Sequence, residues 1–378
     1  MGRRIFLSPP CVGRIERDAV KAAFDSGYIA PCGPQVDEFE RRLAKLSGRR
    51  YAIALASGTA AIDLFLEWLG VGPGWTVVSP TLSFIATVGP ATHRGAKLAF
   101  VDSDATGNMD PALLDVALTE LTASRRGSGA PASSPRILVI GVDLYGSCCD
   151  YVRLQRVCRR HGAVFFVDAA ESVGSKFRGR GSGSAGLAAV YSFNGNKTVT
   201  TSGGGALLTD DRKLAEAARK LATQSREPVL HYEHRAVGYN YRLSNILAAI
   251  GLGQLSHLDG LLARRRRNYE FYAKHLPMMR REPDENHWLN VMLCESERQR
   301  DAVIAALGRE DIESRPAWKP MHLQPVFRAA RPKIRCFGGE VAESIFRCGV
   351  CLPSGPQLTT AELRRIVAIV TRTMAEVK

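Results

Sequence analysis

Strand and helix patterns alternate through the first two thirds of this chain, and that alternation limits the fold more than any other feature of the sequence. Three short segments rich in β-branched and aromatic residues are typical of strands covered on both faces, namely residues 136–142, 163–168 and 188–193. Strands that alternate with helices build a largely parallel sheet. We therefore predict an α/β fold with a mostly parallel central sheet that lies between layers of helices.

The length of the chain predicts two domains. Its 378 residues exceed the size at which a single hydrophobic core usually stops growing. A long helical pattern begins at residue 245, and Gly251 and Gly253 are positions where that helix could loosen. We place the boundary there, with a large domain over residues 1–245 and a smaller α+β domain over residues 246–378.

Composition indicates a globular protein of the cytoplasm. Hydrophobic residues make up 45% of the chain and charged residues 23%, and no apolar run reaches the length of about 18 residues that spans a bilayer. The first ten residues lack the apolar stretch of a secretory signal. Nine cysteines are scattered without a disulfide framework, which fits a reducing compartment.

The net charge of +14 is compatible with three kinds of partner: nucleic acid, an anionic membrane surface, or small acidic substrates. The densest basic run, Arg264 to Arg267, lies in an amphipathic helical pattern, where a solvated face is the simplest interpretation. A basic binding protein without enzymatic activity is therefore one alternative. Such a protein would be colourless, and its affinity for DNA or lipid would fall with salt.

Ser57, Gly58 and Thr59 follow a predicted strand and open a predicted helix. Free N–H groups and the helix dipole at that place can bind a phosphate, although Ser-Gly-Thr at a helix start is also an ordinary N-cap. Asp168 ends another predicted strand, where open α/β sheets bind ligands. A buried carboxylate there needs a partner, and an N-cap or a ligand contact would each provide one.

Lys197 lies between the end of a strand and the glycines Gly203 to Gly205. In a permissive loop beside buried strands a lysine can lose its charge by desolvation and act as an amine nucleophile. A solvated surface lysine is the alternative.

Four segments taken together resemble one enzyme family. They are Ser57 to Thr59, Pro-Thr-Leu-Ser-Phe at 80–84, Asp-Ala-Ala-Glu at 168–171 and Ser-Phe-Asn-Gly-Asn-Lys at 192–197. Their order and spacing resemble the DegT-type nucleotide-sugar aminotransferases, which are fold-type I enzymes dependent on pyridoxal phosphate. The resemblance runs from about residue 5 to the C-terminus.

This resemblance implies a role for each motif residue. Lys197 would hold the cofactor as a Schiff base and then move a proton between substrate and cofactor. Asp168 would pair with the pyridine nitrogen, and Glu171 would lie near the ring hydroxyl, where many family members have Gln. The other implied cofactor contacts are Gly58, Thr59 and Ser192 at the phosphate, Phe84 on the pyridine face, and Asn196 beside the lysine.

Asn240, in the segment 238–245, resembles an asparagine that a neighbouring subunit contributes to the phosphate in this family. The resemblance therefore implies a homodimer with shared active sites. Without it, a turn residue after Gly238 is the simpler interpretation.

One branch of the family is most similar at residues 4–10, 24–40 and 314–327 and at the run Ser202 to Gly205, which departs from the commoner Gly-Glu-Gly-Gly. That branch aminates the 4-position of UDP-4-keto-6-deoxy-N-acetylhexosamines, with L-glutamate as donor, for amino sugar and polysaccharide biosynthesis. GDP-4-keto-6-deoxymannose, as used by perosamine synthases, is the alternative acceptor, and another fold-type I reaction is the alternative activity. The candidate substrate contacts are Arg315, Lys319 and His322 for charge or hydrogen bonds and Trp318 for stacking; taken alone, Trp318 would be a core residue and His322 a structural histidine.

Two further motifs are decoys. Gly181, Gly183 and Gly186 have a dinucleotide-binding spacing, but they precede a strand instead of following one. Cys348 and Cys351 form one C-x-x-C without a second pair, so we expect no metal site.

Overall fold

The structure is a computed structural model that describes residues 4–126, 136–282, 284–330 and 334–377. Residues 120–136 are small and polar, and their sequence predicts a surface connection. Helix α5 (Pro111–Arg126) occupies the start of that segment. The stretch 127–135 lies outside the described residues.

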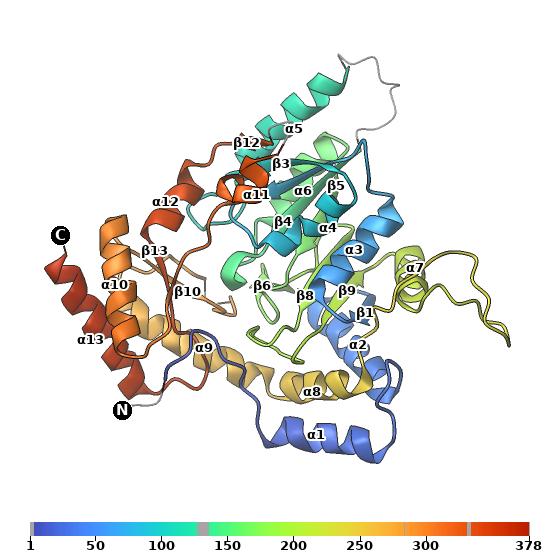
Figure 1. Cartoon of the computed structure of the whole chain (residues 1–378), viewed down its shortest axis with the longest axis horizontal. Coiled ribbons are helices and arrows are strands. Elements are labelled where there is room, and N and C mark those ends of the chain that lie inside the picture. The colour runs from blue at the N-terminus through green and yellow to red at the C-terminus, as the bar shows by residue number, and fades with distance from the viewer. Residues whose placement is uncertain (1–3, 127–135, 283, 331–333, 378) are drawn as a thin grey trace.

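A mostly parallel sheet of eight strands forms the centre of the molecule (Figure 1). Its strand order is β1-β9-β8-β5-β4-β2-β3-β12, and only β9 runs antiparallel to its neighbours. The bounds are β1 Tyr51–Leu55, β2 Thr76–Pro80, β3 Lys97–Val101, β4 Ile137–Val142, β5 Val164–Asp168, β8 Ala188–Ser192, β9 Gly205–Thr209 and β12 Arg335–Phe337. The three strands predicted from apolar segments are β4, β5 and β8, so the predicted α/β fold with a mostly parallel sheet is confirmed.

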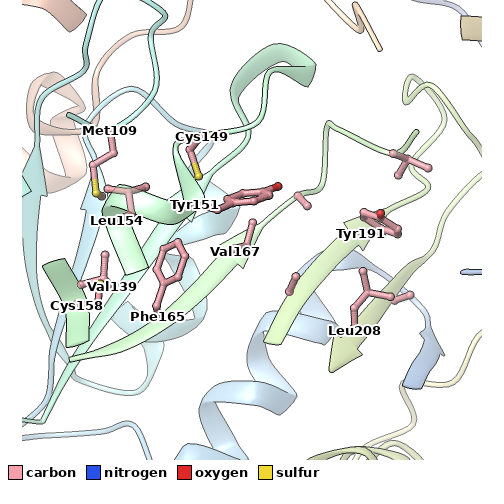
Figure 2. Close-up of a cluster of buried hydrophobic side chains, with 14 of the residues drawn as sticks. Met109, Val139, Cys149, Tyr151, Leu154, Cys158, Phe165, Val167, Tyr191 and Leu208 are labelled. Atoms are coloured by element: carbon pink, nitrogen blue, oxygen red, sulfur yellow. The ribbon is translucent and has the colours of Figure 1, made fainter. Parts of the chain in front are cut away.

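Alternate residues of each strand supply two separate apolar cores. Phe165 and Val167 belong to one cluster, part of which Figure 2 shows, whereas Phe166 belongs to the other. This division follows from the two-residue period of a strand buried on both faces. The first cluster is covered by α2 (Pro34–Ser47), α5, α6 (Tyr151–Arg160) and α8 (Asn245–Ser256), and the second by α3 (Gly58–Leu69), α4 (Gly89–His93) and α7 (Arg212–Ala222).

The C-terminal third builds its own apolar cluster around a sheet of three strands. The elements are α9 Leu258–Ala273, β10 Asn290–Leu293, α10 Glu297–Arg309, β11 Arg315–Pro316, α11 Pro325–Arg328, α12 Glu340–Cys348, β13 Gly349–Leu352 and α13 Thr360–Glu376. Some elements beyond residue 245 lie against the large domain instead: α8 packs on α1 (Arg14–Asp25) and α2, β12 pairs with β3, and Phe327 of α11 packs on Phe100 of β3. The predicted division at residue 245 stays a proposal.

The long helical pattern is broken at His257, where α8 and α9 meet at 63°. The predicted weak points, Gly251 and Gly253, lie inside α8 without interrupting it. Gly251 serves close packing, because a Cβ there would lie 2.5 Å from the ring of Phe39. Across the described residues no single helix has both the length and the apolar character of a membrane span, and only the bent pair α8 and α9 would qualify jointly.

Candidate active site

A cavity of about 810 Å³ opens at the carboxyl ends of β1, β5 and β8. Parallel α/β sheets bind ligands at this edge, and the volume lies in the range of ligand pockets. Ten of the predicted site residues line the cavity: Gly58, Thr59, Phe84, Asp168, Glu171, Ser192, Asn196, Lys197, Arg315 and Trp318. Residues spread over most of the chain therefore meet at one place.

Helix α3 begins at the wall of this cavity. Ser57 is its N-cap, and the Ser57 Oγ accepts a hydrogen bond from the backbone N–H of Ala60 at 3.0 Å. The first turn of a helix leaves N–H groups without intrahelical partners, which favours an anion there. Gly205 of β9 allows the turn to sit against the sheet, because a Cβ at this position would lie 2.3 Å from the nitrogen of Gly58.

Asp168 ends β5 and is 6% exposed. Its carboxylate accepts hydrogen bonds from the Thr87 hydroxyl at 2.7 Å and from the Ala170 N–H at 3.2 Å. Burial raises the pKa of Asp168, while these bonds and the charge of Lys197 oppose the shift. Among the described residues this carboxylate makes no direct ion pair, so a cationic group placed beside it would be stabilised.

Lys197 projects into the cavity with its side chain 13% exposed, and its Nζ lies 3.6 Å from the Glu171 Oε1. Burial lowers the pKa of Lys197, and the nearby carboxylates of Glu171 and Asp168 oppose that shift. Burial also raises the pKa of Glu171 to about 7, although Lys197 and the Tyr145 N–H, which donates to Glu171 at 2.7 Å, oppose it. Burial therefore brings the pKa values of the two groups closer together, which favours proton exchange between them.

Aromatic rings form one side of the site. The Trp318 ring centroid lies 5.6 Å from that of Phe84 and 5.0 Å from that of Tyr145, and the backbone N–H of Trp318 donates to the Tyr145 hydroxyl at 2.8 Å. Phe84 is 56% exposed, so its ring is available to a ligand. These rings offer flat surfaces to a planar or sugar ligand.

Three predicted contacts lie outside the cavity lining. His322 lines a second cavity and bonds to Thr81 Oγ1 at 2.6 Å and to Glu343 Oε1 at 2.9 Å. Lys319 is not among the described residues that line the active-site cavity, and Asn240 is exposed on its own chain. Their binding roles stay predictions.

The fold also brings to the site three residues that the sequence motifs do not indicate. Thr87 orients Asp168, and Tyr145 holds Glu171 through its backbone N–H. Trp288 places its ring 3.8 Å from the Lys197 Nζ. None belongs to the four motifs, and only Thr87, three residues after Phe84, lies close to one of them.

The side chains of this cavity fit pyridoxal phosphate. A desolvated amine at Lys197 suits an aldehyde, and the buried carboxylate of Asp168 suits a protonated pyridine nitrogen. The start of α3 and Ser192 suit the phosphate, since a Cβ on Gly58 would lie only 3.3 Å from the Ser192 Cβ. In the described part of the chain no group of three or more His, Cys, Asp or Glu side chains is placed to hold a metal ion.

Comparison with known proteins matches residues 10–371 to the DegT/DnrJ/EryC1/StrS aminotransferase family. EpsN of Bacillus subtilis, described as a candidate pyridoxal phosphate-dependent aminotransferase, is 40% identical over 98% of this chain and 95% of its own length. GDP-perosamine synthase of Caulobacter vibrioides is 36% identical over 97% of both chains. The solved structure of the sugar aminotransferase candidate Spr1654 of Streptococcus pneumoniae, in its PLP form, covers 100% of both chains with a TM-score of 0.88 and 26% identity. The chain therefore belongs to the DegT/DnrJ/EryC1/StrS aminotransferase family and is a sugar aminotransferase that depends on pyridoxal phosphate.

Proposed function

We propose that this enzyme transfers the amino group of L-glutamate to the 4-keto group of a nucleotide-linked 4-keto-6-deoxy sugar. One observation carries the proposal: the desolvated amine of Lys197 lies 3.6 Å from the Glu171 carboxylate and shares a ligand-sized cavity with the buried carboxylate of Asp168. Lys197 and Asp168 are the proposed catalytic residues.

In this proposal the cofactor contacts are divided among three parts of the cavity. Gly58, Thr59 and Ser192 hold the phosphate, and Phe84 covers one face of the ring. Asp168 holds the ring nitrogen, Glu171 lies at the ring hydroxyl, and Asn196 lies beside Lys197. When bound, pyridoxal phosphate supplies an electron sink for the bond that breaks at the substrate carbon.

Lys197 carries out the proton transfer. Its amine must be neutral to accept a proton, and burial favours that neutral form. Glu171, with its raised pKa, can take up or return a proton 3.6 Å from the Lys197 Nζ. The Lys197 side chain is only 13% exposed, which limits the access of bulk water to that proton.

For the acceptor we propose a UDP-4-keto-6-deoxy-N-acetylhexosamine. Trp318 offers a stacking face and Arg315, which is mostly exposed at the cavity, offers charge for a diphosphate. Lys319 and His322 stay in the proposal as more distant contacts.

The second candidate acceptor is GDP-4-keto-6-deoxymannose. It is supported by the similarity to GDP-perosamine synthase, which extends over nearly the whole chain. Both candidates need the same amine delivery at carbon 4, so the nucleotide and the sugar substituents alone distinguish them.

We further propose that the active enzyme is a homodimer in which Asn240 reaches the neighbouring cofactor site. Asn240 follows a segment with exposed apolar side chains, including Leu230, Tyr232 and Val237. In Figure 1 this segment, between α7 and α8, extends away from the body of the molecule. Exposed apolar groups of this kind favour a protein partner.

The test is a coupled assay of purified enzyme with L-glutamate and each keto sugar, in which release of 2-oxoglutarate is measured. We expect turnover with the UDP sugar and parallel initial-velocity lines, because two half reactions share one site. Turnover with the GDP sugar alone would select the second acceptor. Release with neither would remove both acceptors while the family assignment stands.

A further inference from the structure

Trp288 lies two residues before β10 in the C-terminal third, is 2% exposed and lines the active-site cavity. We infer that Trp288 is a positioning residue for Lys197: its indole N–H fixes the carbonyl of Asn196, and its ring face supports the lysine amine. The inference rests on the proposed role of Lys197.

Two contacts join Trp288 to the lysine. The Trp288 Nε1 donates to the Asn196 carbonyl at 2.6 Å, and the Lys197 Nζ lies 3.8 Å from the centroid of the ring. The Asn196 carbonyl belongs to the peptide group that leads into Lys197, whose own N–H donates to the Asn194 carbonyl at 2.9 Å. Both ends of the peptide group that carries the lysine are therefore held.

Trp288 is itself fixed from three directions. The backbone N–H of Trp288 donates to the Asn286 Oδ1 at 2.9 Å. Its backbone carbonyl accepts from Arg265 Nη1 at 3.1 Å and from Ser354 Oγ at 2.5 Å. Arg265, on α9, is 1% exposed. This buried guanidinium donates to the backbone carbonyls of Trp288 and Ser354, which holds the Trp288 segment in one position.

Asn286 extends the same network to Glu171, whose carboxylate lies beside the Lys197 amine. Its Nδ2 donates to the Glu171 carbonyl at 2.7 Å, while its Oδ1 accepts from the Trp288 N–H. One amide therefore links the backbone of Trp288 to the backbone of Glu171, the two residues whose side chains lie beside the Lys197 Nζ. The ring face favours the ammonium form by a cation–π interaction and leaves the neutral form without a hydrogen-bond acceptor on that side.

The alternative is that Trp288 only fills the core between the two parts of the chain. Fluorinated tryptophans separate the two interpretations, because they weaken the ring's attraction for a cation while they keep its shape and its N–H. We would place tryptophan with one, two or three ring fluorines at position 288 by site-specific incorporation. The pKa of Lys197 in the cofactor-free protein would then be measured from the pH dependence of its acetylation, by mass spectrometry of the peptide that contains it.

We expect the pKa of Lys197 to fall stepwise by about 0.5 unit over the series, with unchanged thermal unfolding. An equal pKa in all four proteins would overturn the inference. In the loaded enzyme, Trp288→Phe removes the N–H donor, and we expect kcat to fall about tenfold with little change in KM for glutamate.

Trp75→Phe is the matched control, because Trp75 is 8% exposed in the apolar cluster on another part of the sheet. It should lower stability without a change in the pKa of Lys197 or in kcat. A normal turnover by Lys197→Ala would instead remove the proposed function, whatever the fluorinated proteins show. An essential Lys197 with an unresponsive pKa would remove only the inference about Trp288.

Discussion

At the residue scale, the site depends on charged groups that are buried before any ligand is considered. Asp168, Glu171 and Lys197 lie within one cavity, and burial opposes the charge of each. Such groups are costly for stability and useful for chemistry, because small changes in their surroundings move their protons.

Asp168→Asn should lower kcat by about two to four orders of magnitude, because loss of one partner of a buried ion pair costs about 3–5 kcal/mol. In this variant the amide at position 168 is uncharged, so it cannot keep the pyridine nitrogen protonated. Steady-state kinetics and the absorbance of the bound cofactor would measure the effect. Asp143→Asn is the control. Asp143 is also buried, but it lies outside the cavity lining and accepts hydrogen bonds from the hydroxyls of Tyr151 and Ser172, so its substitution should reduce stability more than kcat.

Glu171→Gln should change how the stability of the cofactor-free protein depends on pH. The pKa of Glu171 is raised to about 7 in the folded protein, above the ordinary value of 4.5. Its contribution to stability is therefore present below about pH 4.5 and is lost as pH rises through 7. Between pH 5 and pH 8 the wild type should lose about 1–3 kcal/mol relative to the variant.

Urea unfolding of both proteins at several pH values checks this expectation. A difference in unfolding free energy that stays constant from pH 5 to pH 8 would show that Glu171 is already ionised at pH 5. A matched measurement on Glu216→Gln controls for the loss of a carboxylate, since Glu216 lies in an exposed ion pair with Arg212.

At the scale of elements, the proposed phosphate site depends on how closely β9 approaches the start of α3. Gly205→Ala would place a Cβ 2.3 Å from the Gly58 nitrogen and 2.4 Å from the Ser57 carbonyl carbon. The helix start must then shift, and we expect a stability loss of about 1–3 kcal/mol with weaker cofactor binding. Thermal unfolding and titration with pyridoxal phosphate measure the two effects.

Gly308→Ala is the control for this substitution. Gly308 lies in α10 with nothing within 4 Å of its added Cβ. Alanine should raise stability there by about 0.5–1 kcal/mol and leave cofactor binding unchanged. If Gly205→Ala bound the cofactor as tightly as Gly308→Ala, the start of α3 would not be the phosphate site.

At the scale of the whole molecule, the proposed dimer predicts complementation between two defective chains. Lys197→Ala and Asn240→Ala each remove one part of a shared site. A mixed dimer would rebuild one intact site from Lys197 of one chain and Asn240 of the other, so random mixing should restore about a quarter of wild-type activity. The assay is 2-oxoglutarate release after the chains are unfolded and refolded together.

If the mixed chains recover no activity, Asn240 either acts in the same site as Lys197 of its own chain or has no part in catalysis. Sedimentation of the separate variants is the control, since both must remain dimers for the test to be valid. A monomeric wild type would contradict the proposal directly.

The sequence by itself determined what local rules govern: β4, β5 and β8, the N-cap at Ser57, and Asp168 at a strand end. Period, capping and β-branching act within a few residues, so they can be read along the chain. The resemblance of the four motifs added the family and the cofactor, which the comparisons confirm.

Only the tertiary structure decided which distant residues meet. Asn196 and Trp288 are 92 positions apart, and their contact depends on how the C-terminal part docks on the large sheet. The break at His257 and the placement of His322 in a second cavity depend on packing against other elements as well. No periodicity encodes such contacts, because they are selected by the shape of the whole fold and not by neighbours along the chain.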